Sequence, residues 1–305
     1  MMKKFISIIL LCLPFTIIAG GKMDAPEYFI DDGNNIYKTT DYKSYKLIKK
    51  HRGGKIPCYA SHTLINQKKI FYITENDSVT KYDFCFYDEE TQKDILLYTI
   101  PHRGRVCDAY VINNNIYTCE GAADNKITIR KRTVESPEVI KEYEFDFNDT
   151  SYDADTLHSL YVDEENNRFI FLLTRKVQGD IKNMKYILHI CSMTDCKTLY
   201  SVETSLSYLD KHLEGTILYY SYNNMVYKID YTADVISPEK LETFVSTDKN
   251  IVRLSRRDNI FFVMTEYWKF DLMNYLIFGP HVQVWEYYAC KFEDNKIKKI
   301  TKLER

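Results

Sequence analysis

Short apolar and aromatic segments recur along the chain, and each follows a turn marked by asparagine, glycine or charged residues. Ile70–Ile73 and Phe169–Leu173 are continuously apolar, as expected of strands that are covered on both faces. Other segments alternate, and Tyr143, Phe145 and Phe147 are separated by acidic residues. This gradient from two-sided to one-sided burial predicts groups of antiparallel strands whose outermost member faces water.

The unit of a turn followed by a strand repeats at regular spacing. The steps are 34, 46, 53, 48 and 43 residues, measured between Ile36, Ile70, Ile116, Phe169, Ile217 and Ile260. A recurrence of roughly 40–50 residues in an all-strand chain is typical of a β-propeller, in which each repeat forms one four-stranded blade. The sequence therefore predicts an all-β fold, a single β-propeller of antiparallel four-stranded blades with no substantial helix.

Six blades are the best count, and five blades with an N-terminal extension are the alternative. The predicted blades span residues 26–50, 55–100, 105–147, 155–204, 206–247 and 250–304, the first of them short, with three strands. Within the fifth blade, Leu206, Leu209 and Leu213 fit either a helical turn or an inner strand. Glycine-histidine and tryptophan-aspartate repeat signatures are missing, as are sialidase-type aspartate turns. The chain thus resembles six-bladed propellers of exported and envelope proteins in fold alone, and no functional residues carry over from them.

The first 21 residues have the organisation of a secretory signal. Lys3 and Lys4 precede the apolar run 5–18, which Pro14 interrupts, and the small residues 19–21 follow. Such a run is short for a membrane-spanning helix, so cleavage near residues 19–21 is expected, with an uncleaved anchor as the alternative. The mature propeller, residues 22–305, is then secreted or periplasmic, without membrane insertion after cleavage.

Composition narrows the function only slightly. The formal net charge is −2, and the charges are spread without blocks of one sign, which argues against nucleic acid as a partner. Tyrosine is abundant, with 26 residues, which strand propensity explains and carbohydrate stacking could also use. Motifs for a catalytic serine, a metalloprotease or a phosphate-binding loop are missing, so we predict no catalytic residues, no metal and no cofactor.

Seven cysteines follow the signal, and the odd number leaves at least one thiol unpaired within a chain in an exported protein. Cys191 and Cys196 flank the polar turn Ser192–Asp195 between two strand-like segments, so the two side chains could face each other across a hairpin. We therefore predict a disulfide between them, which would contribute about 2 kcal/mol for so small a loop. The alternative is two reduced, packed thiols.

His-Arg-Gly occurs twice at equivalent places. His51-Arg52-Gly53 and His102-Arg103-Gly104-Arg105 each follow an outer strand and lead into the next blade. Such connections share one end of a propeller, and guanidinium groups bind carboxylate or phosphate in a bidentate manner. His51, Arg52, His102, Arg103 and Arg105 are therefore candidate ligands of an anionic group. The structural alternative is pairing of these arginines with nearby acidic residues.

The last blade contains an unusually apolar segment between Thr265 and His281, with Trp268 and Tyr275 among its aromatic residues. It either extends two long strands over the core or forms a lid or docking surface. Trp268 and Tyr275 complete the candidate ligand-binding set.

The sequence favours a non-catalytic, extracytoplasmic ligand-binding or scaffold propeller, whose partner is an unknown protein or an acidic saccharide. The competing interpretation is a propeller glycoside hydrolase or lyase acting on polysaccharide. An enzyme would show two or three converging carboxylates, one of them with a perturbed pKa.

Overall fold

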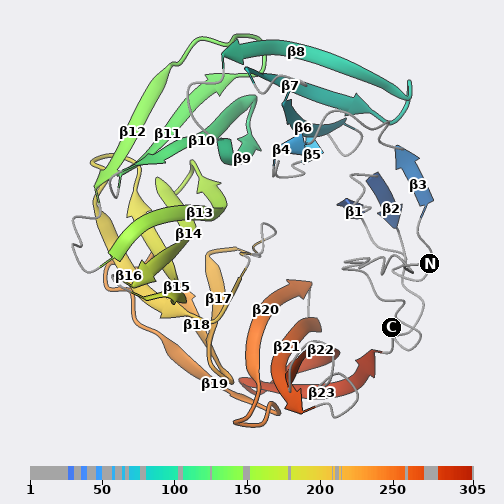
Figure 1. The fold of residues 1–305 in the computed structure, drawn as a ribbon, viewed down its shortest axis with the longest axis vertical. Coiled ribbons are helices and arrows are strands. Elements are labelled where there is room, and N and C mark those ends of the chain that lie inside the picture. The colour runs from blue at the N-terminus through green and yellow to red at the C-terminus, as the bar shows by residue number, and fades with distance from the viewer. Residues whose placement is uncertain are drawn as a thin grey trace. The chain divides into compact units, whose positions relative to one another are not determined.

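A computed structural model shows an all-β chain, and helices are absent from its described residues (Figure 1). The structure describes residues 27–30, 36–39, 46–49, 57–58, 64–65, 69–75, 80–101, 106–123, 126–146, 152–177, 180–207, 209, 213, 215–257, 260–270 and 281–303. None of these residues belongs to a helix long and apolar enough to span a bilayer. The signal segment 1–21 lies outside the described residues and stays a prediction.

The first half of the chain forms three antiparallel sheets, each built from strands that neighbour one another in sequence. The first contains β1 (Glu27–Ile30), β2 (Ile36–Thr39) and β3 (Lys46–Lys49). The second contains β4 (Pro57–Cys58), β5 (Leu64–Ile65), β6 (Lys69–Glu75), β7 (Lys81–Asp88) and β8 (Lys93–Pro101). The third contains β9 (Val106–Ile112), β10 (Asn115–Ala123), β11 (Lys126–Thr133) and β12 (Lys141–Asp146).

The second half continues the same pattern. One sheet contains β13 (Tyr152–Asp163), β14 (Arg168–Val177), β15 (Asp180–Ser192) and β16 (Thr198–Thr204). The next three strands are β17 (Ile217–Tyr222), β18 (Met225–Asp230) and β19 (Glu239–Thr243). The last four are β20 (Asn250–Arg257), β21 (Ile260–Phe270), β22 (His281–Glu293) and β23 (Lys296–Leu303).

These successive meanders are propeller blades, and the predicted all-β propeller fold is confirmed; the described strands fall into six such groups. Their limits match the predicted ranges closely. The described strands depart from four-stranded antiparallel blades in three places. The second sheet has five strands, and the fifth blade has three. In addition, β19 pairs in parallel with β23 through Glu242 and Lys296, which joins the fifth and sixth blades into one seven-stranded sheet. An ion pair of 2.6 Å between these two side chains accompanies the pairing.

Asparagine turns set the register of the hairpins, as their sequence positions suggested. Asn113 and Asn114, between β9 and β10, both have positive φ, at 47° and 66°. Asp294 and Asn295, between β22 and β23, have φ of 53° and 58°. Two successive residues with positive φ form the type I′ turn, whose twist matches that of the flanking strands, and asparagine tolerates this conformation.

The predicted burial gradient is confirmed. Every residue from Phe169 to Leu173 on β14 is fully buried. In β12, Tyr143 and Phe145 are buried, and the alternating acidic residues Glu142, Glu144 and Asp146 are exposed. Inner strands of a blade are therefore covered on both faces and outer strands on one.

The segment 206–213 is neither a regular strand nor a helix at its described positions. Leu206 and Leu209 are each 1% exposed and belong to the core. The backbone N–H of Ser207 donates to Val252 O at 2.9 Å, so the segment pairs locally with β20. Leu206 and Leu209 thus pack in the core where the sequence allows an inner strand of the fifth blade, but their segment lacks the regular hydrogen bonding of a strand.

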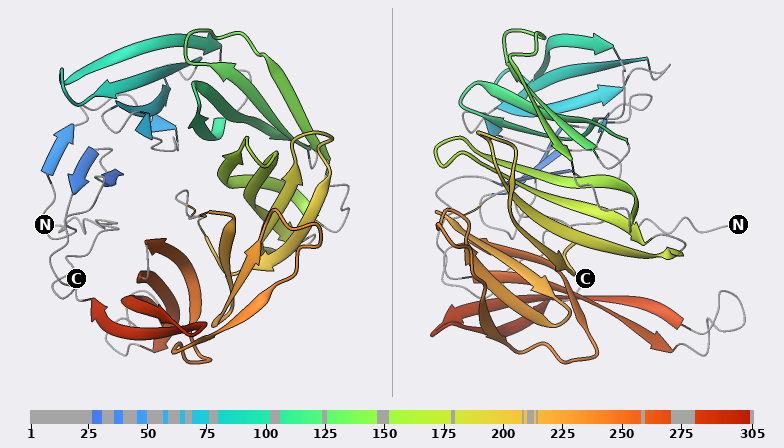
Figure 2. Two further views of the ribbon diagram at one scale, coloured as in Figure 1. Left: turned by 180° about the vertical axis from the view of Figure 1, so that it is seen from behind. Right: turned by 90° about the vertical axis from the view of Figure 1, so that its left-hand side faces the viewer.

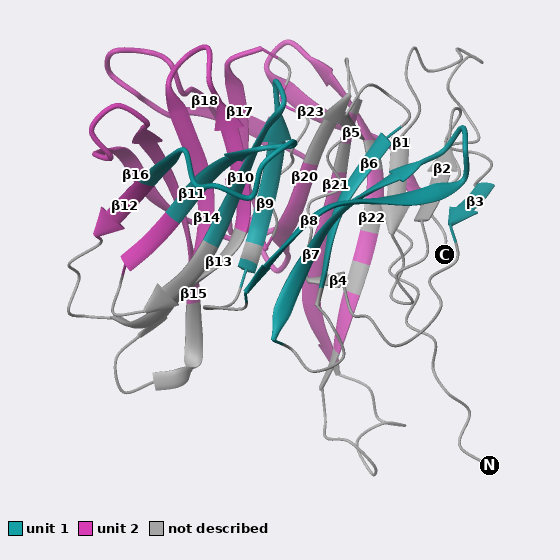
Figure 3. Ribbon diagram, turned by 90° about the horizontal axis from the view of Figure 1, so that it is seen from above, with its two compact units in different colours: residues 1–121, 129–142, 305 teal, residues 122–128, 143–304 magenta. Residues whose placement is uncertain are grey.

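The chain divides into two compact units, which Figure 3 distinguishes by colour. The first comprises residues 1–121 and 129–142, and the second comprises residues 122–128 and 143–304. The first has a core rich in aromatic residues, in which the rings of Phe84 and Tyr98 stack at 4.9 Å. The second has its own core, where Tyr219 of β17 meets Phe261 of β21 edge to face at 4.8 Å.

Candidate functional site

Most of the predicted ligand-binding residues lie outside the described residues. This holds for His51, Arg52, His102, Arg103, Arg105 and Tyr275, whose roles therefore stay predictions. Trp268 is described, and its side chain is 63% exposed. It is the largest side chain among the exposed hydrophobic residues of the structure's described part.

The predicted Cys191–Cys196 disulfide is not formed in this structure, where both residues are free thiols. Cys191 is buried, and its Sγ lies 3.6 Å from Thr198 Oγ1 as a hydrogen-bond donor. Burial raises the pKa of the Cys191 thiol to about 12, so the group is protonated and unreactive at neutral pH. A bridge formed under oxidising conditions stays a prediction.

The apolar segment of the last blade belongs in part to two long strands. β21 reaches Phe270 and β22 begins at His281, and the two pair without interruption down to that point. Figure 2 shows this hairpin, in orange-red, extending past its neighbouring strands in the second unit. Trp268 pairs in register with Gln283 near the tip, and its exposure shows that this part of the hairpin does not cover the core.

We use the term hairpin end for the end of the β20–β23 sheet where β20 begins, β21 ends, β22 begins and β23 ends. Lys249 precedes β20 in the β19–β20 connection. This is the same type of connection, from an outer strand to the next inner strand, as those that hold the two His-Arg-Gly sequences. Trp268 and Lys302 are among the last residues of β21 and β23, at this same end of the sheet.

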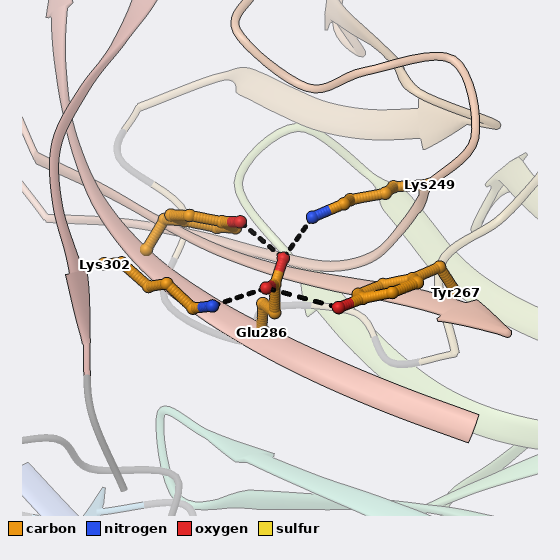
Figure 4. A network of polar contacts seen from close by, with 5 residues as sticks. Lys249, Tyr267, Glu286 and Lys302 are labelled. Atoms are coloured by element: carbon orange, nitrogen blue, oxygen red, sulfur yellow. Dashed lines mark hydrogen bonds and ion pairs between the residues drawn. The ribbon is translucent and has the colours of Figure 1, made fainter. Parts of the chain in front are cut away.

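A buried carboxylate organises the hairpin end (Figure 4). Glu286 on β22 is 8% exposed. Its Oε2 accepts hydrogen bonds from Lys249 Nζ and from Tyr288 Oη, the latter at 2.6 Å. Its Oε1 accepts from Lys302 Nζ and, at 3.5 Å, from Tyr267 Oη. Two ammonium groups and two phenols from four different segments therefore converge on one side chain.

Electrostatics keep this carboxylate ionised. Burial by itself would raise the pKa of Glu286, but hydrogen bonds from Lys249, Lys302 and Tyr288 outweigh it and lower the pKa to about 2. Burial acts against the charge of Lys249 too, and the bond to Glu286 still raises the pKa of that ammonium. Tyr288 has a raised pKa, because of its burial and its bond to Glu286. The cluster is a stable set of opposite charges, unsuited to proton transfer at neutral pH.

Aromatic rings add to the cluster. Lys249 Nζ lies 4.4 Å from the centre of the Tyr267 ring, and Lys299 Nζ lies 5.1 Å from that of Tyr288. Both distances are typical of cation–π contacts. Thr265, in register with Glu286, is fully buried, and its hydroxyl has no hydrogen-bond partner among the described residues. The hairpin end thus combines cations, phenols and a buried hydroxyl.

The sequence contained a signal for this cluster that its interpretation missed. Tyr288 and Cys290 are buried and occupy alternate positions of β22, and Glu286 continues that series as a charged residue on a buried face. Charged residues are almost never fully buried unless they are paired. Lys249 and Lys302 lie far from Glu286 in sequence, so only the strand pairing identifies them as its partners.

A second ion cluster lies in the first unit. Lys49 on β3 is 13% exposed, forms an ion pair with Asp94 and donates to Tyr72 Oη at 2.8 Å. Its Nζ lies 4.0 Å from the centre of the Tyr72 ring and 5.3 Å from that of Tyr87. Tyr87 Oη also donates to Ile48 O at 2.6 Å. These contacts attach the first blade to the second, which gives the cluster a structural role.

The Glu286 cluster offers no acid catalyst at neutral pH. Each carboxyl group with a shifted pKa among the described residues has that pKa lowered, namely Glu135, Asp195, Asp230, Asp248, Glu286 and Glu293. A general acid at neutral pH needs a raised pKa. Within the same described residues, no group of three His, Cys, Asp or Glu side chains is placed to hold a metal ion.

Comparison with known proteins supports the fold and leaves the family open. No protein-family model matches the chain, and no curated protein matches it in sequence. A candidate 6-phosphogluconolactonase from Bacteroides fragilis aligns over 93% of this chain and 94% of its own, with a TM-score of 0.50 and 10% identity. A chain of a mitotic checkpoint complex aligns over 95% of this chain and 88% of its own, with a TM-score of 0.51 and 10% identity.

The propeller domain of a trilobed protease from Pyrococcus furiosus aligns over 88% of this chain and 74% of its own, with a TM-score of 0.43 and 12% identity. At these identities, similarity concerns the fold alone, and the similar structures include both enzymes and members of protein assemblies. The chain is thus a β-propeller whose function has to be inferred from its own residues.

Proposed function

We propose that this protein is an exported, non-catalytic binding module whose contact surface is the hairpin end of the β20–β23 sheet. The observation that carries the proposal is Trp268, which is 63% exposed on a hairpin that projects beyond its neighbours. A large exposed aromatic side chain loses hydrophobic stabilisation unless a partner covers it. Tryptophan is also among the residue types enriched in the energetically dominant contacts of interfaces.

The polar surroundings of Trp268 agree with binding. Lys269 beside it is exposed, and the Glu286 cluster behind it is fixed by charge-assisted hydrogen bonds. A surface that is rigid before its ligand arrives loses less conformational entropy on binding. The hairpin end thus combines the exposed Trp268 side chain with a rigid cluster of polar groups around Glu286.

The competing hypothesis of a polysaccharide hydrolase or lyase has less support. Its chemistry needs two carboxyl groups about 5–10 Å apart, one of them with a raised pKa. At the hairpin end, Glu286 has a pKa of about 2 and both of its oxygens accept hydrogen bonds. Such a carboxylate cannot supply a proton at neutral pH. Export is proposed from the signal-like sequence 1–21, as above.

The chain allows a direct optical test, because its two tryptophans, Trp268 and Trp285, are both in the β21–β22 hairpin. Tryptophan emission would be followed while the mature protein is titrated with a panel of neutral and acidic polysaccharides. We expect at least one polymer to change the emission saturably, and Trp268→Ala to weaken its binding by about tenfold or more.

Two outcomes would contradict the proposal. Release of reducing ends or unsaturated sugars from a bound polymer would show catalysis. Binding that is unchanged in Trp268→Ala would place the contact surface elsewhere. Leu199→Ala is a suitable control, since Leu199 is an exposed hydrophobic residue, at 45%, on β16 of a different sheet in the same unit.

A further inference from the structure

Strand register separates the two faces of the hairpin end. Thr265 pairs with Glu286 and Tyr267 pairs with Val284, so these side chains lie on the same face of the sheet. Lys269, two residues after Tyr267, lies on that face as well, because side chains alternate along a strand. Trp268 and its partner Gln283 lie on the opposite face. The Glu286 cluster and Trp268 therefore lie on opposite faces of the sheet.

Lysines gather on the Glu286 face. Lys302 pairs with Tyr288 and Lys299 pairs with Cys290, which places both on this face. Lys249 reaches it through Glu286, and Lys269 extends it toward the tip. We name Lys249, Lys269, Lys299 and Lys302 the lysine face. Lys269 and Lys299 are exposed, and the side chain of Lys302 is 49% exposed.

Few acidic groups balance these four ammonium groups. Among the described strand residues of β20–β23, register places one acidic side chain, Glu286, on this face. Asp248, exposed in the preceding connection, interacts electrostatically with Lys249 and Glu286. Four positive charges face two negative ones, so the described part of the surface has a positive excess. Such a surface attracts anions and orients them as they approach.

We propose that the lysine face binds the carboxylate groups of an acidic polysaccharide. This inference rests on the proposed binding function and specifies its ligand. Ammonium groups held at fixed positions bind carboxylates through charge-assisted hydrogen bonds. The phenol of Tyr267 and the ring faces around Lys249 provide the polar and aromatic contacts that sugar rings use. A ligand that contacts both the lysine face and Trp268 has to reach both faces of the sheet, so we infer that it is a polymer.

A polysaccharide fits this surface better than an acidic protein does. The centre of a protein interface is depleted of lysine and rich in clustered apolar side chains. Here Lys249 and Lys302 pair with the buried Glu286, and Lys269 and Lys299 lie on the same face. Trp268 is the one exposed large hydrophobic residue among those of β21 and β22 whose side-chain burial the structure describes. One aromatic side chain amid charged groups suits the repeated ring-and-carboxylate pattern of an acidic polymer.

The test compares two forms of one polymer. Polygalacturonate and its fully methyl-esterified form share a backbone and differ in the charge of each unit. We expect the mature protein to bind polygalacturonate, followed by tryptophan emission, and to bind the ester at least tenfold more weakly. The variant Lys269→Gln/Lys302→Gln should weaken polygalacturonate binding by roughly threefold to tenfold, with reduced sensitivity to salt.

Lys298 provides the matched control. It lies on the same strand as Lys299 and Lys302, pairs with Lys291 on the opposite face, and forms an ion pair with Glu293 at 3.5 Å. Lys298→Gln removes one positive charge from the opposite face, where the double variant removes two from the lysine face, and should change polygalacturonate binding by less than about twofold. An equal loss in this control would show unspecific charge attraction and would overturn the assignment of the face.

The remaining outcomes are distinct. Equal binding of the ester and the acid, with loss in Trp268→Ala, would overturn the lysine face and leave the binding function standing. Binding of an acidic protein segment but of neither polymer would refute the saccharide. Failure of Trp268→Ala to affect any binding would refute the proposed function itself. Thermal unfolding of each variant confirms that the substitutions leave the fold intact.

Discussion

Replacing Glu286 by glutamine should destabilise the protein in a way that depends on pH. Glutamine keeps the shape of the side chain and removes the charge that Lys249 and Lys302 share. Lys249, whose side chain is 20% exposed, then keeps its positive charge without its carboxylate. Breaking a buried pair by removal of one partner is strongly destabilising, because an uncompensated charge stays in a poorly solvated place.

The magnitude follows from the pKa. Folding lowers the pKa of Glu286 from 4.5 to about 2. At 1.36 kcal/mol per pKa unit, this shift corresponds to about 3 kcal/mol of stabilisation for a cluster that is fully shielded from solvent. Lys302 is half exposed, and solvent screens its share. We therefore expect Glu286→Gln to lower the free energy of unfolding by about 2 kcal/mol at neutral pH.

The sign of the pH dependence is fixed by the direction of the shift. A carboxyl group with a lowered pKa in the folded state stabilises the protein above its unfolded pKa, and this stabilisation is lost as pH falls through the folded pKa. The window thus runs from pH 4.5 down to about 2. At about pH 3, the difference between the native protein and Glu286→Gln should be less than half of its value at neutral pH.

Urea unfolding followed by tryptophan emission measures this difference, because both tryptophans are in the same sheet as Glu286. Glu242→Gln is the control, since the Glu242–Lys296 pair is exposed, with side-chain exposures of 67% and 46%. It should cost less than about 1 kcal/mol. A Glu286→Gln effect as small as the control, or one that is the same at both pH values, would refute the buried-network interpretation.

Three further predictions concern other parts of the chain. N-terminal sequencing of the exported protein should begin after residues 19–21, and a mature protein that begins at Met1 would contradict the signal. Lys49→Met should lower the free energy of unfolding by about 1–3 kcal/mol, because Asp94 loses its ammonium partner and Tyr72 its cation–π contact, and chemical denaturation would measure the loss. In oxidised protein, a non-reducing peptide map should recover Cys191 and Cys196 in one cross-linked fragment. Alkylation of both without reduction would instead match the free thiols of the structure.

The blades could be predicted from sequence because their signals are local. A turn asparagine with positive φ, as at Asn114, and a fully apolar strand, as at Phe169–Leu173, each report a short-range constraint. Repetition of these signals located the blade limits within a few residues. The parallel pairing of β19 with β23 could not be predicted in this way, because it joins residues more than fifty positions apart.

The candidate site was only partly predictable for the same reason. Trp268 was recognised from local composition, since a run of aromatic residues in one segment is visible without a structure. The Glu286 cluster draws Lys249, Tyr267 and Lys302 from three other segments, and their convergence depends on register across four strands. Register fixes which face each side chain occupies, and a shift of one residue would place Glu286 on the opposite face.

Hydrogen–deuterium exchange of the mature protein with and without polygalacturonate would show whether the hairpin end binds carboxylate groups. We expect slower exchange in the peptides that cover 260–270 and 281–303, with little change in those from β13–β16 in the same unit. We expect the methyl-esterified polymer to give weaker protection at the same concentration. Protection confined to other blades, or equal protection by the two polymers, would contradict a carboxylate-binding surface at the hairpin end.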